Sequence, residues 1–268
     1  MSASDESASL DAKQRNQYRI ESLAKGLQVL RLFDETVTSL RLREVVERTG
    51  LPMPTAFRIV STLEEEGFLD RTDDGVLHPG VAVLTLGSAA LRGSSLVSAS
   101  ERPLRSLAQA TGETVNLGVL QGDQVLYLVR LRNADLVTAN IQVGSTLPAA
   151  FTSMGKVLLA YLTPEELAER VADATFGTGQ GPNAVGSRAA LTEQLEQIRE
   201  RGYAVQDQEL ALGLRSVAVP VFAGGSAPVA AINVAVSAAR HDVDALRGPI
   251  LERVLAAAHE IGLRLAAA

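Results

Sequence analysis

The chain has 268 residues, of which 46% are hydrophobic and only 4% aromatic, so its cores must be built mainly from Ala, Val and Leu. It contains no cysteine, which excludes disulfide frameworks, thiolate metal sites and a cysteine nucleophile. Its 25 basic and 31 acidic residues give a net charge of −6, which argues weakly against nucleic-acid binding unless basic residues gather on one face.

The first 17 residues are polar and lack an apolar core, so we expect a disordered arm and not a signal peptide. No apolar run approaches the roughly 20 residues of a membrane span. The three histidines, His78, His241 and His259, are far apart and match no metal-ligand spacing, so neither a metal nor a cofactor is expected. These features together predict a soluble cytoplasmic protein that does not bind a membrane.

Residues 22–80 carry a compact run of helix, turn and hairpin signals. A helical pattern over 42–49 ends at Gly50, and a second one over 51–63 begins with Pro52 and Pro54, where a missing N–H costs least. A strand at 68–71, a tight turn at 74–75 and a strand at 76–78 follow. This layout is typical of a winged helix-turn-helix that inserts its second helix into a DNA major groove. The alternative is a small helical subdomain with a hairpin.

Charge placement marks one face of this region as the candidate DNA surface. Four arginines and two glutamates between residues 40 and 63 give that stretch a charge of +2. Three glutamates, residues 64–66, close the second helix at its negative dipole end, which favours its N-terminal half as the part that approaches DNA. For any single arginine, the alternative is a solvated surface charge. The candidate DNA-binding residues are Arg43, Met53, Thr55, Arg58 and Arg71.

The chain changes character after residue 80. An amphipathic run over 81–97 predicts a linker helix, and a helix over 102–110 ends at Gly112. The patterns beyond it predict a mixed, largely antiparallel sheet with helices between its strands. Strands are expected at 113–120, 125–131, 136–143, 203–206, 216–223 and 228–237, and helices at 154–162, from 164, at 191–201 and at 243–265, the last broken at 248–249. The predicted organisation is a disordered arm (1–17), a DNA-binding domain (18–80), a linker helix (81–98) and a sheet domain (99–268).

Four segments at consistent spacing resemble the IclR (isocitrate lyase regulator) family of bacterial transcription regulators. They are residues 22–30 (SLAKGLQVL), 51–63, 153–160 (SMGKVLLA) and 202–221, and the resemblance extends over 18–265. It implies an α+β protein with an N-terminal winged helix-turn-helix and a C-terminal GAF-like domain that binds a small effector. It also implies homodimers through the DNA-binding half, usually paired into tetramers. Residues 129–132, 141–148 and 152–155 look most like the branch that controls aromatic-acid and β-ketoadipate catabolism.

The same resemblance implies an effector pocket, which carries over to Leu136, Ala139, Ser153, Met154, Gln206, Leu214, Ser216, Asn233 and Ala235. Residues 153–155 lie where a loop enters a helix, so free backbone N–H groups favour an anion there. Ser216 and Asn233 are polar residues within apolar strands, which requires a partner: a ligand carboxylate, or else backbone or water. The family often has an acid or a thiol where this chain has Gln206 and Ser216. Arg130 and Arg132 could clamp a carboxylate, but alternation places both on one strand face, which could point outward.

Enzyme motifs are incomplete. Gly155-Lys156 resembles the end of a phosphate-binding loop, but Ala150 and Val157 replace the required Gly and Ser/Thr. Residues 177–181 have dinucleotide-loop composition without the spacing, and the carboxylates Asp207 and Glu209 are more typical of a structural loop. No catalytic residue is assigned. The favoured hypothesis is a regulator that binds operator DNA and a small carboxylate effector. The alternatives are a metabolic enzyme acting on small acids with an accessory helical domain, and a DNA-binding architectural protein without an effector.

Overall fold

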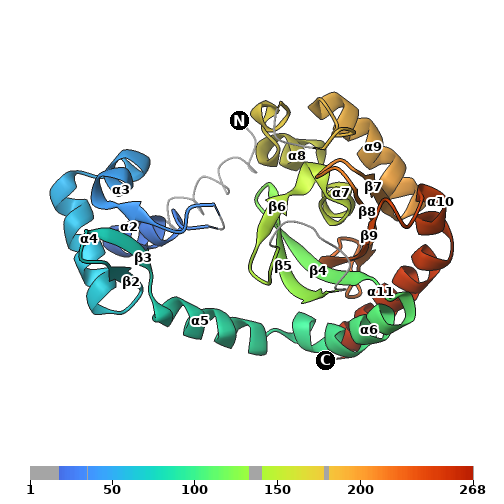
Figure 1. Ribbon diagram of the computed structural model, residues 1–268, viewed down its shortest axis with the longest axis horizontal. Coiled ribbons are helices and arrows are strands. Elements are labelled where there is room, and N and C mark those ends of the chain that lie inside the picture. The colour runs from blue at the N-terminus through green and yellow to red at the C-terminus, as the bar shows by residue number, and fades with distance from the viewer. Residues whose placement is uncertain (1–17, 35, 133–140, 178–180, 268) are drawn as a thin grey trace, which may run out of the picture. The chain divides into compact units, whose positions relative to one another are not determined.

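The computed structural model describes residues 18–34, 36–132, 141–177 and 181–267 and divides the chain into two compact units (Figure 1). The boundary between the units falls between Ala90 and Leu91. The expected disordered arm, residues 1–17, lies outside the described residues. Each unit has its own hydrophobic core, as two separately folded domains require.

The N-terminal unit is a winged helix-turn-helix, as predicted. Its elements are α2 (Glu21–Leu30), β1 (Leu40–Arg41), α3 (Leu42–Thr49), α4 (Met53–Glu65), β2 (Leu69–Arg71) and β3 (Val76–Pro79). The antiparallel sheet has the order β1-β3-β2, so the expected two-stranded hairpin gains a third, two-residue strand that precedes α3. The buried core of this unit consists of Val29, Leu40, Val45, Leu51, Ala56, Val60, Leu69 and Leu77.

Local backbone chemistry sets the corner between α3 and α4. Gly50 ends α3 in the left-handed conformation at φ +69°, and its N–H donates to the Val46 carbonyl at 2.9 Å. Pro52 then caps α4 and Pro54 lies in its first turn, where proline removes no helical hydrogen bond. The stop and start signals therefore turn the chain within three residues.

The expected linker helix over 81–98 is interrupted. Helix α5 (Val81–Arg92) ends before Gly93, and α6 (Ser95–Thr111) begins at Ser94, whose hydroxyl accepts from the Val97 N–H at 3.3 Å. A glycine followed by a capping serine is a helix stop next to a helix start, which the amphipathic pattern alone did not separate. Among the described residues, no single helix has the length and apolar composition of a membrane span; α5 and α6 reach them only when taken together across their break.

The C-terminal unit is built on a six-stranded sheet with the order β6-β5-β4-β9-β8-β7. Its strands are β4 (Thr114–Gln121), β5 (Gln124–Leu131), β6 (Thr146–Pro148), β7 (Ala204–Asp207), β8 (Leu214–Val221) and β9 (Ala230–Ser237). The sequence predicted a mixed, largely antiparallel sheet, and all the strand pairs recorded among the described residues are antiparallel. Of the strand expected over 136–143, residues 136–140 lie outside the described part, residues 141–143 are not extended in a strand, and β6 occupies the sheet edge.

Helices cover both faces of this sheet (Figure 1). Long helices α6 and α11 (Leu251–Ala266) pack on one face over an apolar core that includes alternate residues of β8 and β9. Helix α7 (Ser153–Leu159) packs on the other face, next to α9 (Arg188–Arg201), and α8 (Pro164–Arg170) joins them. Short helical turns complete the unit: Ala149–Phe151, Asp173–Thr175, Val243–Ala245 and Leu246–Ile250. The backbone departs from helical geometry at Gly248, before Pro249, which confirms the break predicted there.

Candidate functional site

The N-terminal half of α4 presents exposed side chains to solvent, while Ala56 and Val60 fasten the helix to the core. Met53 is 43% exposed, and Arg58 is exposed on the same helix. Thr55 is half-buried. Arg43 is exposed on α3. Phe57 was not singled out in the sequence, and it is 52% exposed.

Arg71 on the wing is held by α4. Its Nε and Nη2 donate to the two carboxylate oxygens of Glu64 at 2.6 and 2.8 Å, a bidentate pair. The guanidinium lowers the pKa of the Glu64 carboxyl, and the carboxylate raises the pKa of Arg71. On the opposite strand, Arg41 donates to the carbonyl and carboxylate of Asp74 in the wing turn. Both arginines therefore connect the wing to the helix pair.

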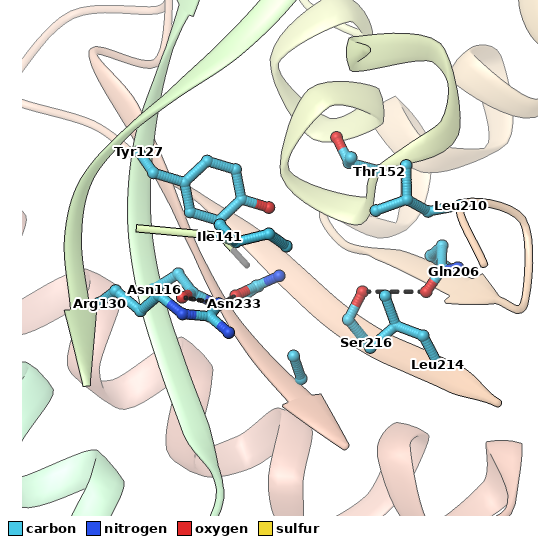
Figure 2. A pocket seen from close by; sticks show the side chains of 11 residues that line it. Asn116, Tyr127, Arg130, Ile141, Thr152, Gln206, Leu210, Leu214, Ser216 and Asn233 are labelled. Atoms are coloured by element: carbon cyan, nitrogen blue, oxygen red, sulfur yellow. Dashed lines mark hydrogen bonds between the residues drawn. The ribbon is translucent and has the colours of Figure 1, made fainter. Parts of the chain in front are cut away.

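A second candidate site lies inside the C-terminal unit, between the sheet and the segments that surround α7 (Figure 2). It is an internal cavity with about 20 Å³ of free space, the volume of little more than one water molecule. Figure 2 shows Asn116, Arg130 and Asn233 on one side and Gln206, Ser216 and Leu214 on the other. The lining residues are Asn116, Tyr127, Arg130, Ile141, Thr152, Gln206, Leu210, Leu214, Ser216, Asn233 and Ala235.

The structure brings together most of the residues that the resemblance implied. Five of them line this cavity: Gln206, Leu214, Ser216, Asn233 and Ala235. Ser153 is fully buried and bonds to two of those five, and Met154 is fully buried in the core between α7 and the sheet. Leu136 and Ala139 lie outside the described residues.

Sequence reasoning missed Asn116, Tyr127, Ile141, Thr152 and Leu210, and it left the direction of Arg130 open. Asn116 carried the signal used for Asn233, a polar residue inside an apolar strand. In β4 it lies directly opposite both Asn233 and Arg130. Cross-strand partners share one face of the sheet, so Arg130 points to the cavity side and not outward. Burial lowers the pKa of Arg130.

A row of hydrogen-bonded side chains crosses the sheet beneath the cavity. At one end, Arg130 Nη1 donates to Asn116 Oδ1 at 3.0 Å. Asn116 Nδ2 donates to Asn233 Oδ1 at 2.7 Å, and Asn233 Nδ2 donates to Ser153 Oγ at 3.4 Å. The polar groups of β4 and β9 are therefore partnered within the protein, so a ligand is not needed to explain their presence.

The row continues on the other strands. The hydroxyl oxygens of Ser153 and Ser216 are 2.7 Å apart, and Ser216 Oγ lies 3.3 Å from the side-chain amide of Gln206. Gln206 and Ser216 are direct cross-strand partners on β7 and β8. The whole row thus joins residues of β5, β4, β9, β8 and β7 with the first residue of α7.

The entrance of α7 is capped by the protein itself. Thr152 Oγ1 accepts from the Gly155 N–H at 3.0 Å, and all seven residues of the helix are buried. The capping threonine also lines the cavity. The sequence expectation that an anion occupies the N–H groups of residues 153–155 is not tested by these contacts, although one of the three is already bonded.

Lys156 is buried in an ion pair, which removes it from any phosphate-loop role. Its Nζ donates to the Glu209 carboxylate and, at 2.6 Å, to Gln194 Oε1. Burial lowers the pKa of Lys156 and raises the pKa of Glu209, and in each case the opposite charge counteracts the shift. Asp207 is paired with Arg215 at 2.7 Å. Asp207 and Glu209 are thus two structural anions in separate ion pairs, and not a carboxylate pair.

Comparisons with known proteins agree with this architecture. Residues 22–73 match the IclR helix-turn-helix domain, and residues 88–263 match the bacterial transcriptional regulator IclR C-terminal domain. The chain is 32% identical to the Pca regulon regulatory protein of Pseudomonas putida, over 90% of this chain and 82% of that protein. It is 31% identical to the transcriptional repressor IclR of Escherichia coli K12, over 81% of this chain and 80% of that protein.

A solved structure is also similar over nearly the whole chain. It is an IclR homolog from Microbacterium hydrocarbonoxydans in complex with 4-hydroxybenzoate, with a TM-score of 0.73 and 28% identity. The match covers 92% of this chain and all of that one.

Proposed function

Because the chain belongs to the IclR family of bacterial transcriptional regulators, with a DNA-binding N-terminal domain and an effector-binding C-terminal domain, we propose that a small organic acid bound in the cavity controls its affinity for operator DNA. The observation that carries the proposal is the meeting of five implied effector residues in one internal cavity. The relative in complex with 4-hydroxybenzoate has the same fold and supports an acid of that size.

The lining of the cavity favours an anion. Among the described residues, the lining contains one arginine and several neutral hydrogen-bonding side chains, and no aspartate or glutamate. Ile141, Leu210, Leu214 and Ala235 offer apolar contact for a hydrocarbon body. A compact monocarboxylate fits this division between polar and apolar walls, and we propose that it is aromatic. The relation to the Pca regulon regulatory protein supports the aromatic branch.

We propose that binding enlarges the cavity, because its free space of about 20 Å³ is much smaller than an aromatic acid. An acid that binds the enlarged form better than the closed form shifts the population toward it. Residues 81–98, which form α5 and the start of α6 and not the single helix expected, are the proposed carrier of that shift to the DNA-binding half.

On the DNA side, we place Met53, Thr55 and Arg58 of α4 against base edges or phosphates, with Arg43 contacting the backbone from α3. The exposed ring of Phe57 adds an apolar surface suited to a thymine methyl group. Arg71 reaches DNA from the wing only in competition with Glu64, so its proposed contribution is to hold the wing beside the recognition helix.

A dimer is the proposed working form. Leu23 and Leu27 of α2 and Leu84 and Leu86 of α5 are 47–75% exposed, which leaves apolar surface that a second copy can cover. Pairing of two recognition helices doubles the number of base pairs read. Tetramers, a cytoplasmic location and the lack of catalytic activity are further expectations, supported by the regulator relatives.

The test is a screen of benzoate, 4-hydroxybenzoate, 3,4-dihydroxybenzoate and short 2-keto acids for a rise in melting temperature, followed by titration of protein–operator complexes. The expected result is that at least one acid both raises the melting temperature and changes operator affinity. Turnover of such an acid would favour the enzyme hypothesis, and operator binding that no acid changes would favour an architectural protein.

A further inference from the structure

The hydrogen-bonded row beneath the cavity has a direction, and Arg130 fixes it at one end. A guanidinium carries five N–H donors and no acceptor. Asn116 must therefore turn its oxygen toward Arg130, which leaves its Nδ2 to donate to Asn233 Oδ1. Asn233 then faces Ser153 with its own Nδ2. Each bond from this end is donated in the direction of Ser153.

Backbone N–H groups fix the direction at the other end. Figure 2 draws the Gln206 amide with its oxygen toward Ser216. In the opposite orientation, Oε1 accepts from the N–H groups of Glu209, Leu210 and Gln208 at 2.8, 3.1 and 3.3 Å, and Nε2 donates to Ser216 Oγ at 3.3 Å. The second orientation is the stable one, because an NH₂ group facing three N–H donors makes no bond with any of them. Each bond from this end is donated in the direction of Ser216.

The two directions meet at the Ser153–Ser216 pair with one hydrogen in surplus. Each hydroxyl has one hydrogen and two lone pairs, and the 2.7 Å contact between them uses one of the two hydrogens. The only other groups bonded to this pair in the described part of the chain are Asn233 and Gln206, and both donate. The second hydroxyl hydrogen therefore has no acceptor among the described residues.

Burial decides which serine carries that hydrogen. Ser153 is fully buried and is not part of the cavity lining, whereas Ser216 lines the cavity. A hydroxyl hydrogen without an acceptor is costly in a buried position. The favoured arrangement has Ser153 donate to Ser216, which leaves Ser216 to direct its own hydrogen into the cavity beside the Nε2 group of Gln206.

We propose that Ser216 and Gln206 select the effector by the kind of atom it presents: the cavity takes a hydrogen-bond acceptor at this point, a carboxylate oxygen above all, and rejects a donor. Gln206 is the specificity-determining residue, because its Nε2 donates to Ser216 Oγ and so leaves the Ser216 hydroxyl hydrogen free to point into the cavity. The inference rests on the proposed function, that the cavity binds a small acid, and names the residues that read the acid group.

The chemistry of Gln206→Glu follows from the same bonds. One carboxylate oxygen would accept from the N–H groups of residues 208–210, and the other would accept the Ser216 hydrogen. The donor would turn away from the cavity, and a negative charge would face the ligand. Ser216→Ala removes the donor without adding charge. Ser100→Ala is the matched control, because Ser100 is also buried in this unit and, among the described residues, its hydroxyl bonds only to the Val97 carbonyl on α6.

The experiment measures dissociation constants of 4-hydroxybenzoate and of its neutral amide, 4-hydroxybenzamide, by calorimetry on the full-length protein and these three variants. Gln206→Glu is expected to weaken 4-hydroxybenzoate binding at least about tenfold and to lower its preference over the amide by a similar factor. Ser216→Ala is expected to weaken 4-hydroxybenzoate about tenfold, and Ser100→Ala is expected to bind as wild type does. A general loss of folding would weaken the binding of both compounds together. The ratio of the two dissociation constants therefore separates a change in selectivity from a loss of stability.

The possible failures are distinct. If the wild type binds neither compound nor any acid of the screen, the proposed function is wrong and the inference falls with it. If the wild type binds 4-hydroxybenzoate and both Gln206→Glu and Ser216→Ala bind it within twofold of wild type, the cavity binds acids but these two residues do not select them. Should Gln206→Glu not fold, the result for Ser216→Ala decides alone.

Discussion

Arg58 is the residue on which the proposed DNA surface can be tested most directly. It is exposed on the half of α4 that the glutamates at the helix end leave free for DNA. Arg58→Ala should weaken operator binding and leave the melting temperature nearly unchanged. Loss of a phosphate contact should lower the slope of log affinity against log salt by about one, and loss of a base contact should cost about 1–3 kcal/mol at one operator position.

The matched control for this test is Arg105→Ala, an exposed arginine on α6 that pairs with Glu101 on the surface of the other unit. It should change neither affinity nor salt slope. If Arg58→Ala binds operator as tightly as wild type at every salt concentration, Arg58 does not contact DNA.

Lys156 and Glu209 place two opposite charges in the core of the C-terminal unit, with side chains only 2% and 9% exposed. Removal of one partner leaves the other charge buried and uncompensated. Lys156→Met should therefore lower the free energy of unfolding by about 3–5 kcal/mol. The double variant Lys156→Met/Glu209→Leu should recover most of that loss, because no charge is left without a partner.

Urea denaturation of the wild type, the single variant and the double variant measures this difference. A single variant that loses less than about 1 kcal/mol, or a double variant no better than the single, would show that the pair is not a compensated buried ion pair.

At the residue scale, the sequence was informative where a polar side chain lies within an apolar strand. Ser216 and Asn233 were chosen because polar groups in apolar strands need partners, and both line the cavity. Arg130 could not be placed, because alternation fixes which residues share a face but not which face is inside. The cross-strand pairing with Asn116, which settles that question, depends on a register between distant segments.

The wing is the element whose attachment depends on one ion pair. The guanidinium of Arg71 lowers the pKa of the Glu64 carboxyl below its usual 4.5. This stabilisation is complete above the unfolded pKa and is lost as the pH falls through the lower, folded pKa. Because both side chains are partly exposed, its magnitude should be below about 1 kcal/mol.

Glu64→Gln should remove that pH dependence. The difference in stability between wild type and variant should be present at about pH 6 and shrink toward zero below the usual glutamate pKa of about 4.5. Urea midpoints at several pH values measure it. A difference that stays constant down to about pH 3 would mean that the variant acts by some route other than the loss of this charge.

Elements were predicted well where local signals decide them and poorly where pairing decides them. Glycine and proline at 50, 52, 54 and 248–249 marked a helix turn and a helix break that the structure contains. Strands β1 and β6 have only two and three residues, too few for an alternating pattern, and exist because a longer neighbour pairs with them. The stop at Gly93-Ser94 carried a capping signal that the apolar periodicity on both sides concealed.

At the scale of the whole molecule, the exposed leucines of the N-terminal unit predict self-association. Light scattering should show a dimer, or a dimer of dimers, at micromolar concentration. Leu84→Glu on α5, where the leucine is 75% exposed, should shift the protein toward monomer. Leu212→Glu, at a leucine 79% exposed in the other unit, is the matched control and should not. A wild-type monomer with and without DNA would contradict this proposal.

The response of operator binding to the effector depends on both units, because the acid is proposed to bind in one and DNA in the other. An acid can change operator affinity only by the free energy with which it distinguishes two conformations, typically about 1–3 kcal/mol, or roughly 5- to 150-fold. Ser153→Leu should occupy the space next to Ser216 and abolish the response to the acid while operator binding remains. Because Ser153 is fully buried, the larger side chain could also strain the core, so Ala235→Val serves as a milder second variant that narrows the cavity from β9. Operator titrations with and without 4-hydroxybenzoate measure both. If both variants still respond at the wild-type acid concentration, the effector binds elsewhere, because neither substitution leaves the cavity as it was.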